Sequence, residues 1–235
     1  MNKNLSTKKD LQKIIDAYDS VVKGIDAKAK ENEDRAYGGI IRADKGSLVE
    51  SIAHDLVKIA WREIGGQLND ISLEKKFIKI PIQQNYIDKI KSNEVKDYIK
   101  NNINNFYYSL KMDVHVSIKS KLKLAIECKS YTENAMLKRI LVDFTLLKQI
   151  HPDTKFILLQ LESQLGGDYG TKNLIKLGSP STHTLLSYFD IDLNIITLLE
   201  GERKIDKPIH KKDFYKALEY KDLENALKTI KDLLK

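Results

Sequence analysis

The stretch that decides the fold is Lys111–Tyr131, KMDVHVSIKSKLKLAIECKSY. It predicts two β-strands joined by a tight polar turn, Met112–Ile118 and Leu122–Ser130. Successive side chains of a strand point to opposite faces, so Glu127 and Lys129 share one face and Cys128 faces the other way. If the strands pair antiparallel, Asp113 approaches Glu127 at one end of the hairpin. Two carboxylates and an ammonium group placed together are suited to a hard divalent cation and a phosphate.

This hairpin resembles the catalytic core of the PD-(D/E)XK nuclease superfamily. Asp113 and the triplet Glu127-Cys128-Lys129 match the motif, with thirteen residues between Asp113 and Glu127 and with Met112 where proline often stands. The resemblance implies an α/β fold with a mixed β-sheet flanked by helices, that is, a restriction-endonuclease-like core. An E-x-K triplet also arises by chance in a lysine-rich chain, and the alternative is an edge hairpin whose charged end is solvated.

The resemblance also assigns chemistry to these residues. Asp113, Glu127 and the backbone carbonyl of Cys128 would hold Mg²⁺, for which Mn²⁺ can substitute, and the metal would polarise the scissile phosphate. Lys129 would orient the attacking water and offset negative charge on the phosphate. The Cys128 thiol itself is expected to be chemically silent, because no histidine is placed to activate it.

The composition is that of a soluble globular protein with a basic excess. The 235 residues carry 40 Lys and Arg against 33 Asp and Glu, a net charge of +7, which favours a polyanionic partner. The single cysteine excludes a disulfide within the chain and fits a cytoplasmic protein, and no apolar run reaches the roughly 20 residues of a membrane helix. No Walker motif is present, so no nucleotide cofactor is expected. We expect one nuclease domain over 1–235, with an N-terminal helix and basic loop at 1–45, a catalytic core at 46–200 and a C-terminal helical segment at 201–235.

The N-terminal part predicts two helices and a loop between them. Apolar residues repeat at helical spacing over about 6–30. Residues 31–46 break that pattern, and the loop expected there carries three basic residues that either reach DNA or belong to a solvated linker: Arg35, Arg42 and Lys45. Ser47, followed by Glu50 at capping-box spacing, is expected to begin the second helix. Glu50 is either part of this cap or, as in PD-(D/E)XK enzymes, a further acidic residue of the metal site.

Beyond the hairpin the chain predicts a βαβ unit. Residues 133–150 have a helical apolar pattern, and 155–163 is a continuous apolar run typical of a buried strand. A crossover helix between two strands makes them parallel, so this strand should run parallel to the strand of Glu127. A further strand is expected at 193–199, and basic amphipathic helices over 211–234.

Polar and basic side chains near these elements are candidates for DNA contacts. They lie in the lead-in to the helix at 133–150 and in the glycine-rich loop expected at 164–184: Ser130, Tyr131, Asn134, Lys172 and His183. Residues 67–110 are less regular, with a short strand near Pro81 and an interrupted helix over 86–106.

With its small size and no helicase or ATPase motif, the chain resembles a type II restriction endonuclease. That resemblance implies sequence-specific cleavage of double-stranded DNA by a homodimer in which each subunit cuts one strand. A repair nuclease or a Holliday-junction resolvase has the same chemistry and a different substrate. Two further hypotheses are a catalytically inert DNA-binding module on the same fold and an α/β protein whose E-x-K triplet is accidental.

Overall fold

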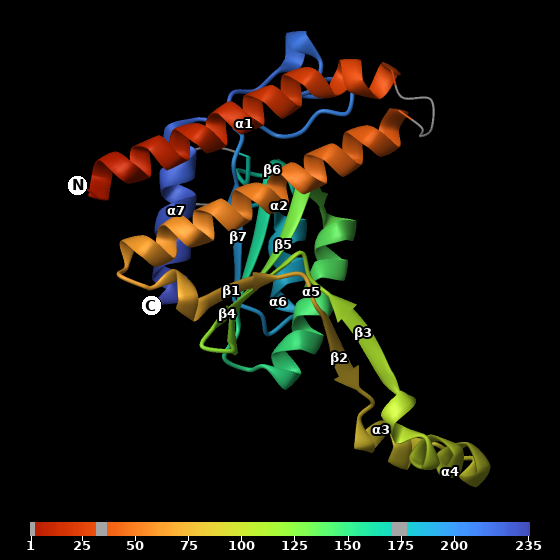
Figure 1. The fold of residues 1–235 in the computed structure, drawn as a ribbon. Helices are drawn as coiled ribbons and strands as arrows, with labels where there is room; N and C mark the ends of the chain where they lie inside the picture. Colours follow the sequence, from red (N-terminus) through yellow and green to blue (C-terminus); the bar gives the residue numbers. More distant parts are fainter. Residues whose placement is uncertain (1–2, 32–36, 171–177) are drawn as a thin grey trace.

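The computed structural model describes residues 3–31, 37–170 and 178–235. Their strands form a five-stranded mixed sheet and a separate two-stranded sheet, and helices cover both faces of the larger sheet (Figure 1). This is the helix-flanked mixed sheet that the sequence predicts. None of the helices within those ranges is long and apolar enough to cross a bilayer.

The larger sheet has the strand order β1-β4-β5-β6-β7. Its strands are β1 (Ile71–Glu74), β4 (Val114–Ile118), β5 (Lys121–Glu133), β6 (Lys155–Gln164) and β7 (Leu193–Thr197). β4 runs antiparallel to both neighbours, whereas β5, β6 and β7 are parallel. Lys119 and Ser120 join β4 to β5, and both have the positive φ of a type I′ turn. The helix α5 (Asn134–Ile150) crosses from β5 to β6, so the predicted βαβ unit is confirmed.

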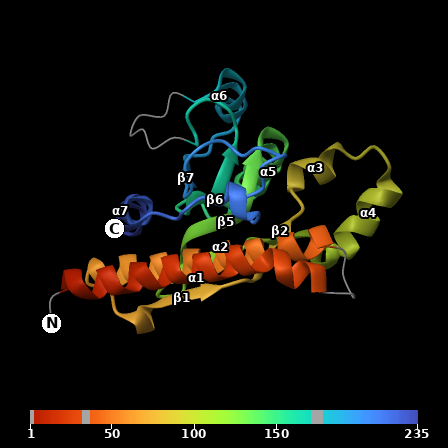
Figure 2. The ribbon, with the colours of Figure 1, turned by 90° about the horizontal axis from the view of Figure 1, so that it is seen from above.

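One face of the sheet is covered by three helices. α1 (Lys3–Glu31) and α2 (Tyr37–Glu63) lie side by side across it, and α7 (Tyr220–Leu234) packs beside them (Figure 2). The buried side chains of this layer include Leu11, Tyr18 and Leu56. Each fully buried aliphatic or aromatic side chain of this kind contributes about 1.5–3 kcal/mol relative to an exposed one.

The prediction of a loop before Ser47 is wrong for residues 37–46, the described residues directly before Ser47. Residues 37–46 form the beginning of α2, and Ser47 lies inside that helix. Ile40 and Ile41 bury their side chains against Ile25 and Ala29 of α1. Tertiary packing therefore outweighs the poor helix propensity of the two glycines at 38 and 39.

The opposite face is covered by α5 and by α6 (Pro180–Ser187) (Figure 2). α6 lies within the stretch predicted as a loop, and that prediction is wrong there. The side chain of Ser179 accepts the backbone N–H of Thr182 at 3.2 Å and caps the helix, and Pro180 occupies its first turn. Near the C-terminus, only α7 and a short 3-10 helix at Lys212–Phe214 are helical within the predicted 211–234.

The second sheet belongs to an arm, which we define as residues 77–111. Its elements are β2 (Phe77–Pro81), α3 (Gln84–Lys89), α4 (Asn93–Asn101), a 3-10 helix (Ile103–Asn105) and β3 (Tyr107–Lys111). A further 3-10 helix, Leu68–Asp70, precedes β1. The arm projects from the sheet on the side away from α1 and α2 (Figure 1). The pair α3 and α4 matches the interrupted helix that the sequence predicts.

Candidate active site

A break in a long β-ribbon places Lys75 opposite Asp113. The ribbon consists of β1 paired with β4, followed by β2 paired with β3. The register pairs that flank the break are Glu74 with His115 and Phe77 with Lys111. Two residues on one side therefore face three on the other, as in a bulge, which bends a ribbon and redirects its side chains. The Nζ atom of Lys75 consequently lies 3.3 Å from Oδ1 of Asp113.

Lys129 lies between the two carboxylates of the predicted motif. Its ammonium donates to Oε1 of Glu127 and lies 3.4 Å from Oδ2 of Asp113. Oδ2 of Asp113 also accepts the backbone N–H of Cys128 at 2.9 Å. The structure thus brings Asp113, Glu127 and Lys129 together where β5 passes the end of β4.

The two sides of Cys128 have different environments. Its thiol is buried in the core beneath α2, where burial first, and then the negative charges of Asp113 and Glu127, raise its pKa well above the ordinary value. Its carbonyl oxygen instead faces the site and accepts from Nζ of Lys129 at 3.2 Å. The backbone of Cys128, and not its side chain, therefore belongs to the site.

A second lysine extends the site to α2. Nζ of Lys75 donates to Oε1 of Glu50 at 2.6 Å, and the same ammonium contacts Asp113. Because α2 begins at Tyr37, Glu50 lies in the helix interior and the capping-box interpretation is wrong. Glu50 instead joins Asp113 through the lysine that they share.

The oxygen atoms of the site fit a hard divalent cation. Oδ2 of Asp113, Oε1 of Glu127 and the Cys128 carbonyl all approach one positive centre, the Lys129 ammonium. Within the described ranges, no group of three or more His, Cys, Asp or Glu side chains is arranged to hold a metal. A set of two carboxylates and a carbonyl is compatible with Mg²⁺, which keeps several waters and uses one or two carboxylates.

The electrostatics keep both lysines charged. Burial alone would lower the pKa of Lys129, but Glu127 and Asp113 outweigh it and raise that pKa. Glu50 and Asp113 likewise raise the pKa of Lys75 against its partial burial. Burial would raise the pKa of Asp113, yet Lys129, the Cys128 N–H and Lys75 hold it below the ordinary value. For Glu127, burial and the neighbouring Asp113 prevail over Lys129, and its pKa is raised.

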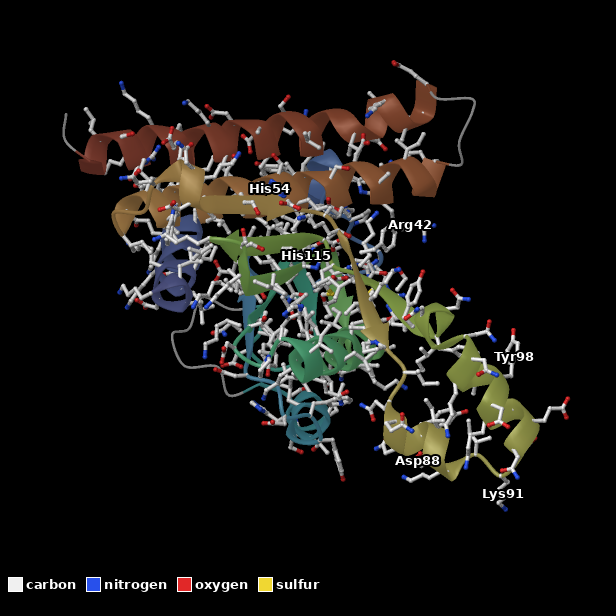
Figure 3. The ribbon with its side chains drawn as sticks, turned by 60° about the horizontal axis from the view of Figure 1, so that its bottom comes forward. Arg42, His54, Asp88, Lys91, Tyr98 and His115 are labelled. Atoms are coloured by element: carbon white, nitrogen blue, oxygen red, sulfur yellow. The ribbon has the colours of Figure 1, made fainter. Side chains whose placement is uncertain are left out.

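Of the basic candidates for DNA contacts, one is exposed, one is buried and two lie outside the described residues. Arg42 is exposed on α2, and in Figure 3 its side chain projects on the side from which the arm extends. Lys45 is buried, with Nζ 3.3 Å from Nδ1 of His210, and does not face the surface as the predicted loop would have placed it. Arg35 and Lys172 lie outside the described residues.

The polar candidates follow the site along β5 and α5. Ser130 and Tyr131 come directly after Lys129, and the guanidinium of Arg203 stacks 3.6 Å from the centre of the Tyr131 ring. Asn134 donates to Oγ of Ser181 at 3.1 Å and accepts from Oγ1 of Thr182 at 2.8 Å, which ties α5 to α6. His183 is exposed on α6, and its ring lies 6.2 Å from that of Tyr169.

Comparison with known proteins decides the family. No family model matches the chain. The chain is 47% identical over 234 residues to the type II restriction enzyme DdeI of Desulfomicrobium norvegicum, and the match covers 97% of this chain and 98% of that enzyme. The chain belongs to the DdeI family of type II restriction enzymes. A solved structure, the native BbvCI A2B2 tetramer, is similar over 97% of this chain and 94% of that one, with 16% identity and a TM-score of 0.36.

The sequence predicts a restriction endonuclease, the class to which this family belongs, but no pattern in it points to Lys75. Lys75 could be found from the register in which β1 and β2 pair with β4 and β3, because Lys75 and Lys76 are the unpaired residues between β1 and β2. β1 alternates apolar and polar residues, Ile-Ser-Leu-Glu, but it is only four residues long and too short to be a clear strand signal. Asp113 and Lys75 are 38 positions apart, and only the pairing of their strands joins them.

Proposed function

We propose that this chain is a Mg²⁺-dependent endonuclease of the PD-(D/E)XK type that hydrolyses phosphodiester bonds at a specific sequence in double-stranded DNA. The observation that carries the proposal is the approach of Asp113, Glu127 and the Cys128 carbonyl to the Lys129 ammonium. Membership of a restriction-enzyme family and the net charge of +7 support it.

Each residue has a defined task in this proposal. Asp113, Glu127 and the Cys128 carbonyl would hold Mg²⁺, or Mn²⁺ in its place, and the metal when bound supplies Lewis acidity toward the scissile phosphate. The Lys129 ammonium offsets the negative charge that builds on the phosphate and orients water through its N–H groups. Glu127 is only 8% exposed, and the low polarity around it strengthens these interactions.

Lys75 acts as a positioning residue in the same scheme. Oδ1 of Asp113 faces Lys75, while Oδ2 faces Lys129 and the Cys128 N–H. With both oxygens engaged, the carboxylate is held in one orientation. Partners of this kind orient the groups that bind a metal, and their loss typically costs about 10–100-fold in metal affinity or activity.

The active unit is proposed to be a homodimer. One such cluster exists within the described part of the chain, whereas a duplex has two strands to cut. A second copy related by a two-fold axis supplies a second site of opposite polarity, which suits a palindromic target.

Digestion of bacteriophage DNA in the presence of Mg²⁺ tests the proposal. We expect discrete fragments from the wild type and none from Glu127→Ala or Lys129→Ala. Lys148→Ala is a matched control, because it removes a lysine that pairs with Asp190 away from the site, and it should cut normally.

Each competing function gives a different outcome in the same assay. A smear, or cleavage of branched or damaged DNA alone, would move the function to a repair nuclease or a resolvase. Binding without cleavage would leave an inert DNA-binding module. Neither cleavage nor binding would overturn the proposal.

A further inference from the structure

The arm begins and ends beside the active site. Lys75 lies two residues before its first residue, and Asp113 lies two residues after its last. Its base is fixed, because Ile80 and Leu110 belong to the buried cluster that α5 forms on the sheet. In Figure 3 Lys91 and Tyr98 lie at its far end, away from the sheet.

Exposed hydrophobic side chains are concentrated on the arm. Half of the fourteen large hydrophobic side chains that are exposed in the described residues belong to it. Five of these are aromatic: Phe77, Tyr86, Tyr98, Tyr107 and Tyr108. Phe77 and Tyr98 are 64% and 63% exposed. A gathering of this kind marks an interaction surface.

The charge on the arm is positive and unneutralised. It contains six lysines against three acidic residues, a net charge of +3. Outside the arm, Lys75, Lys129 and Lys216 are each paired with a carboxylate. None of the six arm lysines makes an ion pair within the part of the chain that the structure describes. Their charge is therefore available to a partner.

Lysines and aromatic rings alternate on the outer face of the β2–β3 ribbon. Nζ of Lys111 lies 5.0 Å from the centre of the Phe77 ring, and Nζ of Lys79 lies 4.2 Å from that of Tyr107. The strand period of two puts these four side chains on one face, while Ile80 points to the other. Cation–π contacts hold the ammonium groups in place and leave N–H donors for an anion.

We propose that this outer ribbon face binds the phosphate backbone of the duplex beside the cleavage site, an inference that rests on the proposed function. Lys111 is two residues from Asp113, so the face begins next to the catalytic cluster. Two copies of the arm would repel each other through their like charges, whereas a phosphate backbone has the complementary charge. Contacts of this kind add affinity without reading sequence.

Salt-dependent binding of a labelled duplex in EDTA tests this assignment. We compare the wild type with the double variant Lys79→Gln/Lys111→Gln. Lys121→Gln/Lys123→Gln is the matched control, since it removes two exposed lysines at the start of β5. Loss of two phosphate contacts should reduce the slope of log K against log salt by about 1.8 and weaken binding about 10–100-fold near 0.1 M salt. The control should leave the slope as in the wild type.

A footprint of the same complexes gives a second readout. The arm variant should lose protection of the backbone beside the cleavage site and keep protection at the site itself. An unchanged slope and footprint, or an equal loss in the control, would overturn the arm assignment while leaving the proposed function standing. A wild type that dimerises and an arm variant that sediments as a monomer would reassign the face to a second copy of the chain. A wild type that does not bind DNA would overturn the proposed function and the arm assignment together.

Discussion

The Nζ atom of Lys75 lies 3.3 Å from Oδ1 of Asp113, and the same ammonium donates to Glu50 at 2.6 Å. A residue at the break of the β-ribbon thereby joins the start of β4 to the interior of α2. The site is thus built from three separate parts of the chain, and its geometry depends on how the ribbon bends.

Replacing Lys75 should impair cleavage more than stability. In Lys75→Met, Asp113 loses the partner of one oxygen and Glu50 loses its only ion pair among the described contacts, so the single-turnover rate should fall about 10–100-fold. The free energy of unfolding should change by no more than about 1 kcal/mol, because these charges are partly exposed. The control is Lys76→Met, which removes the neighbouring lysine that pairs with Glu74 at the surface. Equal rates in the two variants would contradict a positioning role for Lys75.

Replacing the side chain of Cys128 should leave cleavage intact. Only its backbone N–H and carbonyl face the site, so Cys128→Ala should cut at close to the wild-type rate and lose about 1 kcal/mol of stability from the buried position. The native thiol should react with a thiol reagent only after unfolding, because burial raises its pKa and shields it. Rapid labelling of the folded protein, or loss of cleavage in a folded Cys128→Ala, would show that the thiol itself takes part.

His210 should make the protein less stable as the solution is acidified. Partial burial first, and then the charges of Lys45 and Lys211, lower its pKa from 6.5 to about 4. The unfolded chain therefore binds a proton below pH 6.5 that the folded chain binds only near pH 4, so stability falls as the pH decreases through this window. Urea unfolding of the wild type and His210→Gln between these pH values measures the effect. The variant should lose less stability on acidification, and parallel curves for the two proteins would contradict the assignment.

The hydrogen bonds around His210 explain why the neutral form is favoured. Tyr37 donates its hydroxyl proton to Asp26, so the Nε2 atom of His210, 3.1 Å away, donates to the Tyr37 oxygen. Nδ1 then accepts from the Lys45 ammonium. A second ring proton would face that ammonium directly. The cluster joins α1, α2 and the segment before α7.

The sequence predicts best those features that depend on neighbouring residues. Glu127 and Lys129 share a strand face because they are two positions apart, and the crossover helix between two strands makes those strands parallel. These local patterns predict the β5-α5-β6 unit and the meeting of Asp113 with Glu127.

Features that depend on distant contacts are not predictable in this way. The chain from 37 to 46 contains two glycines and has the pattern of a loop, yet it is helical because Ile40 and Ile41 bury themselves against α1. The same loop-like pattern predicts Lys45 as a basic loop residue, but Lys45 lies in α2 and is buried beside His210. Lys75 enters the site only because β1 and β2, the strands on either side of it, pair with β4 and β3, which lie far along the chain.

The Mg²⁺ dependence of single-turnover cleavage by Asp113→Asn tests whether Asp113 binds the catalytic cation. Asp143→Asn is the matched control, because Asp143 lies close enough to raise the pKa of Glu127 but makes no described ion pair with Lys129. We expect Asp113→Asn to lose at least about 100-fold in rate at any Mg²⁺ concentration, and Asp143→Asn to stay within about tenfold of the wild type. Cleavage by Asp113→Asn at the wild-type rate and with the wild-type Mg²⁺ dependence would show that Asp113 does not bind the cation.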